Sequence, residues 1–160
     1  WYYEILSPGF KYNLTDIAAA LGLAQLKKCE RFWKGREHYA ALYQEGFQDL
    51  PEITCPPTTP DIQHAWHLYV IQLNVDCLQI SRDEFIRQLQ QAGIGCSVHF
   101  IPLHLHPYHR DRGGYRPEDF PVASAAFQRI VSLPLYSKMT EEEVNRVIET
   151  VRDLVTRNRR

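Results

Sequence analysis

Apolar positions in the first third of the chain follow the period of an α-helix. Thr15 stands where a helix cap is expected, and Asp16 follows it at the end of the helix dipole that favours a negative charge. Beyond them, apolar residues recur at spacings of three and four up to Phe47. The pattern predicts one long helix to about residue 48, with Gly35 as the candidate position for a kink. A helix of that length is typical of an element that joins two bodies.

The rest of the chain alternates between strand-like and helix-like patterns. Two capping boxes, Ser81 with Glu84 and Thr140 with Glu143, mark helix starts, and Gly93 marks a helix end. Aromatic and β-branched runs between the helices mark strands. This order predicts an α/β lobe in which helices cover a small sheet. The expected elements are a proline-rich connector over 51–60, strands over 64–74, 97–101 and 131–133, a loop over 102–117, and helices over 81–93, over 122–130 and from 140 onward.

Composition places the chain among soluble globular domains. Its 160 residues are 44% hydrophobic and 23% charged, with 18 Lys and Arg against 19 Asp and Glu. That balance lacks the basic surplus of a nucleic-acid binder, and the one dense basic run is the tail from Arg157 to Arg160. No apolar run approaches the roughly 20 residues that span a bilayer, and the start lacks the features of a signal peptide. No membrane partner is expected, and the expected location is the cytoplasm.

The four cysteines are scattered and form no C-x-x-C pair. This favours reduced, mostly buried thiols over a disulfide framework or a zinc knuckle. The chain opens on Trp1, Tyr2 and Tyr3 without an initiator Met, as if inside a structured element. We therefore expect it to be part of a longer protein.

Four histidines, His99, His104, His106 and His109, lie within eleven residues. Imidazoles at this spacing can bind zinc, but a zinc site needs a further Cys or carboxylate, and only Asp111 is near. The same side chains can instead line a polar pocket and bond an anionic or hydroxylated ligand, or cap loop carbonyls at the surface. The residues alone leave these three interpretations open.

Lys11 and Asn13 come just before the expected helix start at Thr15, where backbone N–H groups and the helix dipole favour an anion. A cation, an amide and a helix N-terminus together indicate a phosphate site, although Asn and Thr are also ordinary helix caps. The chain has no Walker loop, no G-x-G-x-x-G and no G-x-S-x-G motif.

The segment from Pro8 to Leu26 resembles the one that follows the catalytic lysine in the DegT/DnrJ/StrS group of pyridoxal-phosphate nucleotide-sugar aminotransferases. Its K-Y-N-L-T-D form is most similar to that of the members that make UDP-4-amino-4-deoxy-L-arabinose. Further motifs follow in the family's order and extend the resemblance over nearly the whole chain. They are HAWHL at 64–68, ISRD at 80–83, GIG at 93–95, VHFIPLH at 98–104, SLPL at 132–135 and MTEEE at 139–143.

The resemblance implies the C-terminal part of a fold-type I aminotransferase. Residues 1–50 would be the end of the large domain and an interdomain helix, and residues 51–160 a small α/β domain. The full enzyme would move an amino group from an amino acid, by analogy glutamate, to a nucleotide-linked keto-sugar in polysaccharide or cell-envelope biosynthesis. The Schiff-base lysine has no match here, so this chain alone would be inactive.

The resemblance also implies a homodimer with shared active sites. Asn13 would reach the phosphate of the pyridoxal cofactor in the neighbouring subunit, with Lys11 as the second candidate. Two other functions stay open: a sugar-binding or dimerisation module without chemistry, and a zinc hydrolase. The residues expected to line the sugar-nucleotide side of the pocket are His99, His104, Tyr12 and Tyr108.

Overall fold

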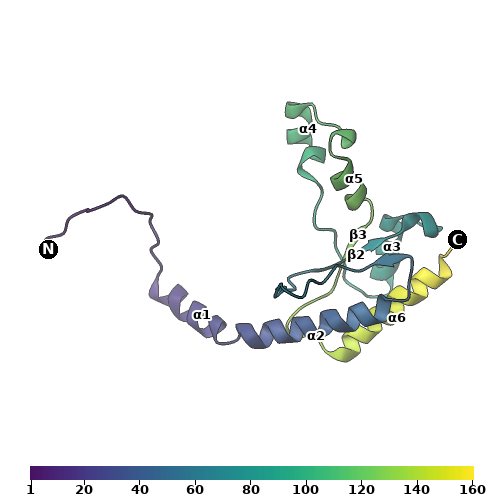
Figure 1. Ribbon diagram of the computed structural model, residues 1–160, viewed down its shortest axis with the longest axis horizontal. Coiled ribbons are helices and arrows are strands. Elements are labelled where there is room, and N and C mark those ends of the chain that lie inside the picture. The colour runs from purple at the N-terminus through teal and green to yellow at the C-terminus, as the bar shows by residue number, and fades with distance from the viewer.

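A small sheet and six helices make up the computed structural model, which describes all 160 residues (Figure 1). Three short 3₁₀ turns, at 75–77, 103–105 and 117–119, lie between them. None of the helices has both the length and the apolar character needed to cross a bilayer. In chain order the elements are α1 (Asp16–Leu26), α2 (Cys29–Phe47), β1 (Ile53–Thr54), β2 (Tyr69–Leu73), α3 (Arg82–Gln91), α4 (Pro107–Gly113), α5 (Pro121–Phe127), β3 (Ile130–Leu133) and α6 (Glu141–Arg157).

The sheet is antiparallel with strand order β1-β2-β3. Tyr69 pairs with Leu133, and Ile71 pairs with Val131. Successive side chains of a strand point to opposite faces, and Tyr69, Ile71 and Leu73 are accordingly buried while the residues between them are more exposed. The buried face of the sheet forms one wall of the core, as expected of an α/β lobe.

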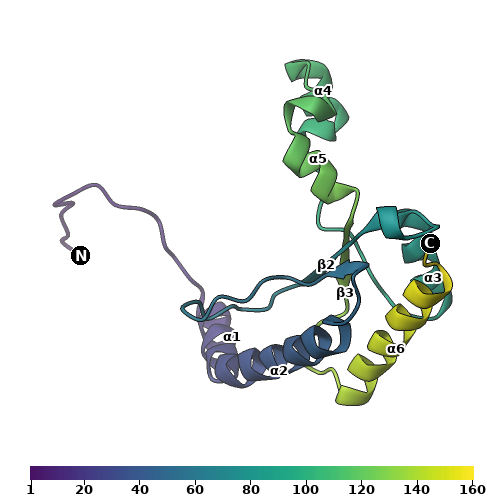
Figure 2. The ribbon, with the colours of Figure 1, turned by 45° about the vertical axis from the view of Figure 1, so that its right-hand side comes forward.

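Helices α2, α3 and α6 complete the core around the sheet (Figures 1 and 2). The ring centroid of Tyr43 lies 4.9 Å from that of Tyr69, and the Tyr43 hydroxyl donates to the carbonyl of Pro134 at 2.8 Å. Burial raises the pKa of Tyr43, so its hydroxyl stays a donor. Other fully buried members of this core are Phe47, Phe85, Leu89, Val144 and Val151.

The packing of α2 on α6 depends on a glycine. A Cβ built on Gly46 would lie 2.7 Å from Cγ2 of Ile148, so only a residue without a side chain allows this approach. Next to it, Arg152 donates to the Gly46 carbonyl at 2.7 Å and forms a two-pronged ion pair with Asp49 at 2.5 and 2.8 Å. The hydrogen bond from Arg152 lowers the pKa of Asp49 to about 2.

The predicted caps at Thr15 and Thr140 are confirmed, whereas of the capping box predicted at Ser81 only the bond from the Glu84 N–H is present. The Thr15 hydroxyl accepts from the N–H of Ala18 at 3.3 Å, and Ser81 caps α3 through the N–H of Glu84. The full capping box of Thr140 and Glu143 is present at α6. These local signals were sufficient because each bond joins residues three apart in the chain.

The expected single helix to residue 48 is wrong, since it is divided into α1 and α2 at Lys27 and Lys28, and α2 runs through Gly35 without a break. Tertiary packing explains the break between the two helices. Side chains of α2 are buried in the core, whereas α1 buries none in this chain, so packing fixes the direction of α2 alone.

The second expected strand, over 97–101, is also wrong. Ser97 makes a single bridge to Ser132, and the chain then leaves the sheet edge. The third strand is instead β1, inside the connector expected over 51–60, where it pairs at the edge of the sheet. The expected loop over 102–117 contains α4, which begins at Pro107, a favoured first residue of a helix. The thiols are all unpaired, but Cys29 is exposed and the other three are half-buried.

We predict that Gly46→Ala lowers the free energy of unfolding by about 1–3 kcal/mol, because the new methyl group must displace Ile148. Gly35→Ala is the matched control in the same helix. Its methyl group would meet only the Tyr39 ring, at 4.0 Å, and helix propensity should raise stability by up to about 1 kcal/mol. Denaturant unfolding of the full protein measures both. Equal stabilisation by the two substitutions would contradict the close approach.

Candidate functional site

The segment that carries Lys11, Tyr12 and Asn13 lies outside the core. Residues 1–15 form no helix or strand, are exposed throughout, and extend away from the lobe (Figures 1 and 2). Neither Lys11 nor Asn13 forms a side-chain hydrogen bond, while the Thr15 hydroxyl is used by its own helix. The donor groups of Lys11 and Asn13 are therefore free for a ligand.

The segment 1–15 and helix α1 also present an unusual amount of apolar surface. Tyr12 is 84% exposed, and α1 has no buried residue although its sequence is mostly apolar. Single exposed apolar residues are normal, but a contiguous set indicates a contact surface. The large exposed side chains are Trp1, Tyr2, Tyr3, Ile5, Leu6, Phe10, Tyr12, Leu14, Ile17, Leu21, Leu23 and Leu26.

The histidine segment forms a projecting arm, which we define as residues 100–127. It contains α4 and α5 and extends from the sheet on a side of the lobe away from residues 1–15 (Figures 1 and 2). Tyr108 lies on α4 and is 69% exposed. Other large apolar side chains exposed on the arm are Phe100, Ile101, Leu103, Tyr115, Phe120 and Val122.

His99 lies at the base of the arm, and His104 lies within it. Nδ1 of His99 is 2.8 Å from the hydroxyl oxygen of Ser132, a buried residue of β3. Nε2 of His104 is 3.0 Å from the hydroxyl oxygen of Ser124 on α5. His104 is buried and His99 is half-buried, so each imidazole is held by one serine and has limited access to solvent.

The candidate residues thus form two groups in this chain. Lys11, Tyr12 and Asn13 share the N-terminal segment, whereas His104 and Tyr108 lie in the arm and His99 at its base, with no hydrogen bond between the two groups. The zinc interpretation required several imidazoles or an added carboxylate at one point. The structure gathers no three His, Cys, Asp or Glu side chains that could hold a metal ion.

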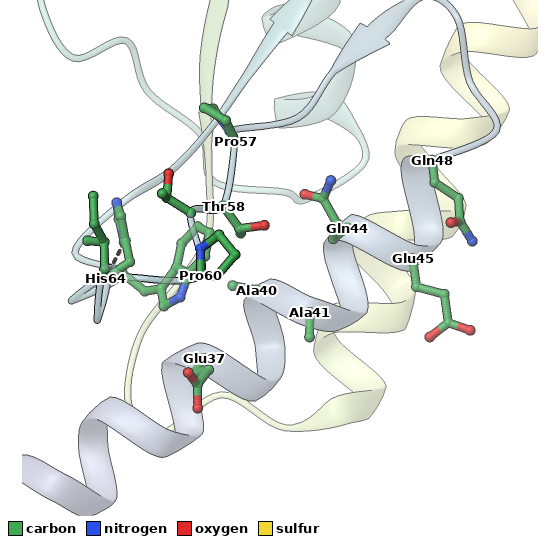
Figure 3. Close-up of a pocket in the computed structure, with 13 residues that line it drawn as sticks. Glu37, Ala40, Ala41, Gln44, Glu45, Gln48, Pro57, Thr58, Pro60 and His64 are labelled. Carbon is green, nitrogen blue, oxygen red and sulfur yellow. Dashed lines mark hydrogen bonds between the residues drawn. The ribbon is translucent and has the colours of Figure 1, made fainter.

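A groove with a volume of about 700 Å³ lies between α2 and the segment 57–66 (Figure 3). Pro57 and Thr58 lie over the helix, and His64 stands at one end. Among the lining residues Glu37 and Glu45 carry charge, and none is Lys or Arg. This groove has the size of a small-molecule site, but its charge does not suit a diphosphate.

Two side chains of helix α2 hold the backbone of the segment 57–66. The Trp33 indole donates to the carbonyl of His64 at 2.9 Å, and Nη1 of Arg36 donates to the carbonyl of Trp66 at 2.9 Å. Trp66 has a φ of +48°, which a bulky residue adopts only when its surroundings impose it. Sequence reasoning identified none of these anchors, because each bond joins residues about thirty positions apart.

The fold is that of sugar aminotransferases of known structure. Spr1654 of Streptococcus pneumoniae, described as a sugar aminotransferase and solved in its PLP form, superposes with a TM-score of 0.83 at 32% identity, over 98% of this chain and 40% of that chain. The chain belongs to the DegT/DnrJ/EryC1/StrS aminotransferase family, whose model matches residues 1–152.

Two curated proteins are also similar to this chain. MJ1066 of Methanocaldococcus jannaschii is 48% identical over 99% of this chain and 41% of its own length. The spore coat polysaccharide biosynthesis protein SpsC of Bacillus subtilis is 47% identical over 97% of this chain and 40% of its own length. The chain therefore spans about two fifths of the length of the relatives that it matches.

Proposed function

We propose that this chain forms part of a PLP-dependent aminotransferase that transfers an amino group from an amino acid, by analogy glutamate, to a nucleotide-linked keto-sugar. The observation that carries the proposal is the family match over residues 1–152. The relative SpsC is named for polysaccharide biosynthesis, which supports a sugar as the acceptor. We place residues 1–50 with the larger domain of the enzyme and residues 51–160 in its small domain.

Lys11 and Asn13 fit the phosphate of such a cofactor. Both side chains end in N–H donors, both are exposed, and neither is engaged elsewhere in the chain. They also lie just before the N-terminus of α1, where the helix dipole favours a negative group. When bound, pyridoxal phosphate supplies the electron sink that lets an amino group leave a carbon atom. The role of Lys11 and Asn13 is to bind and orient it.

The sugar side of the pocket is assigned to the arm. His99 and His104 are held in fixed orientations by Ser132 and Ser124, and Tyr108 presents an exposed ring nearby in sequence. Fixed imidazoles suit the recognition of hydroxyl groups, because a pre-oriented hydrogen-bonding group loses little entropy on binding. We assign Tyr12, on the N-terminal segment, to the same pocket.

A homodimer with shared active sites would bring the two groups together. In one chain the N-terminal segment and the arm extend from different sides of the lobe (Figure 2). The exposed apolar residues of 1–15 and α1 provide the surface that such an association would bury.

All four cysteines are unpaired, which fits a reducing compartment such as the cytoplasm.

In the full-length enzyme, Asn13→Ala is expected to weaken cofactor retention by roughly ten- to a hundredfold, since a hydrogen bond to a charged group contributes about 1.5–3 kcal/mol. Asn13→Asp should weaken cofactor retention further, because its carboxylate repels the phosphate. Equilibrium dialysis against pyridoxal phosphate measures the loss, and thermal unfolding without cofactor checks that the fold is intact. If both variants retain the cofactor like the wild type, Asn13 has no part in the site.

Shared active sites predict complementation between two inactive variants. One carries a substitution of the cofactor-binding lysine outside residues 1–160, and the other carries Lys11→Ala with Asn13→Ala. A mixed dimer then contains one site with both defects and one with neither, so up to about half of the normal activity per mixed dimer should return. Transamination of the mixture, with differently tagged subunits to prove mixing, is the measurement. Mixed dimers without activity would place these residues outside a shared site.

A further inference from the structure

His104 is held by a hydrogen-bond relay inside the arm. Its Nε2 lies 3.0 Å from Oγ of Ser124, and the same hydroxyl donates to the carbonyl oxygen of Pro117 at 2.9 Å. His104 belongs to the 3₁₀ turn at 103–105, Pro117 to the turn at 117–119, and Ser124 to α5. The relay therefore joins three elements of the arm at one side chain.

The relay determines which nitrogen of the imidazole carries the proton. A serine hydroxyl has one proton, and the Pro117 carbonyl can only accept, so the proton of Ser124 points to Pro117. Ser124 Oγ must then accept from His104, which requires a proton on Nε2. If Ser124 donated to His104 instead, a lone pair of Ser124 Oγ would face a lone pair of the Pro117 carbonyl oxygen across 2.9 Å. In the neutral ring, Nδ1 is left as an acceptor.

Nδ1 is also the one polar atom of the ring that no group of the chain bonds. His104 is 7% exposed, and no other hydrogen bond engages its ring. Because no buried polar side-chain atom of the chain lacks a partner, the unbonded Nδ1 must have contact with the surface. The ring of Phe120 packs against the imidazole, with the two ring centroids 4.6 Å apart.

We propose that Ser124 is a positioning residue that fixes His104 as a hydrogen-bond acceptor, and that His104 Nδ1 accepts from a hydroxyl group of the sugar. The sugar contact rests on the proposed function; the relay does not. A hydroxyl can donate to a free lone pair, whereas the oxygens of a diphosphate carry no proton at neutral pH and would be repelled by it. His104 therefore faces the sugar ring and not the diphosphate.

The test uses the full-length enzyme with a UDP-linked 4-keto-6-deoxyhexose as substrate and UDP alone as inhibitor. In His104→Gln the amide nitrogen takes the place of Nε2 and still donates to Ser124, but nothing replaces Nδ1. We expect KM for the sugar nucleotide to rise roughly five- to tenfold, the loss of one neutral hydrogen bond. Inhibition by UDP, the half-reaction with the amino acid and the Tm should stay as in the wild type.

Ser124 is tested by a pair of substitutions. Ser124→Ala removes the acceptor for Nε2 and should raise KM for the sugar nucleotide in the same way, with little change in inhibition by UDP. Ser124→Thr keeps the hydroxyl and should restore a KM near that of the wild type. A KM that is unchanged in Ser124→Ala would remove Ser124 from the positioning role.

The protonation state itself can be observed by NMR on the full-length protein labelled with ¹⁵N-histidine. The ring of His104, identified by its absence in His104→Gln, should show a protonated Nε2 and an unprotonated Nδ1, and Ser124→Ala should lose this fixed pattern. A wild-type Nε2 without a proton overturns the relay, and a proton on Nδ1 overturns its role as an acceptor, whether or not the enzyme is active. An active enzyme whose His104→Gln variant has an unchanged KM, or binds UDP more weakly, overturns the sugar contact alone. A wild type that transaminates no keto-sugar contradicts the proposed function and the sugar contact together.

Discussion

The close approach of α2 and α6 at Gly46 is the constraint on which the arrangement of the chain depends. With Ile148 filling the space of a missing side chain, α2 lies near enough for Tyr43 to reach the sheet and for Arg152 to bind the Gly46 carbonyl. Once α2 is fixed, the donors on its first turns hold the carbonyls of His64 and Trp66. Helix α2 thereby positions both the core and the segment 57–66.

The same packing explains why the candidate site residues lie outside the lobe. The core accommodates α2, α3 and α6, and leaves the N-terminal segment and the helices α1, α4 and α5 without a buried residue. These projecting parts carry the free donors of Lys11 and Asn13 and the braced imidazole of His104. Any ligand of these groups would therefore be bound on extensions of the lobe and not in its core.

The two groups of candidate residues differ in how far the chain orders their side chains. Lys11 and Asn13 have no partner in the chain, so a ligand must order them and bear that entropic cost. His99 and His104 are already oriented by buried or half-buried serines. In the proposed function this difference would make the arm the more selective part of the pocket, since a fixed acceptor distinguishes a hydroxyl from an anion.

The sequence by itself determined the features that arise from neighbouring residues and from motif order. The caps at Thr15, Ser81 and Thr140, the α/β class and the family follow from it, because these depend on bonds three residues apart or on ordered motifs. Tertiary structure alone decided the break between α1 and α2, the place of the third strand, and the contact of His104 with Ser124. Each of these is set by contacts between distant segments: the burial of α2 alone, the pairing of β1 with β2, and the relay through Ser124 to Pro117.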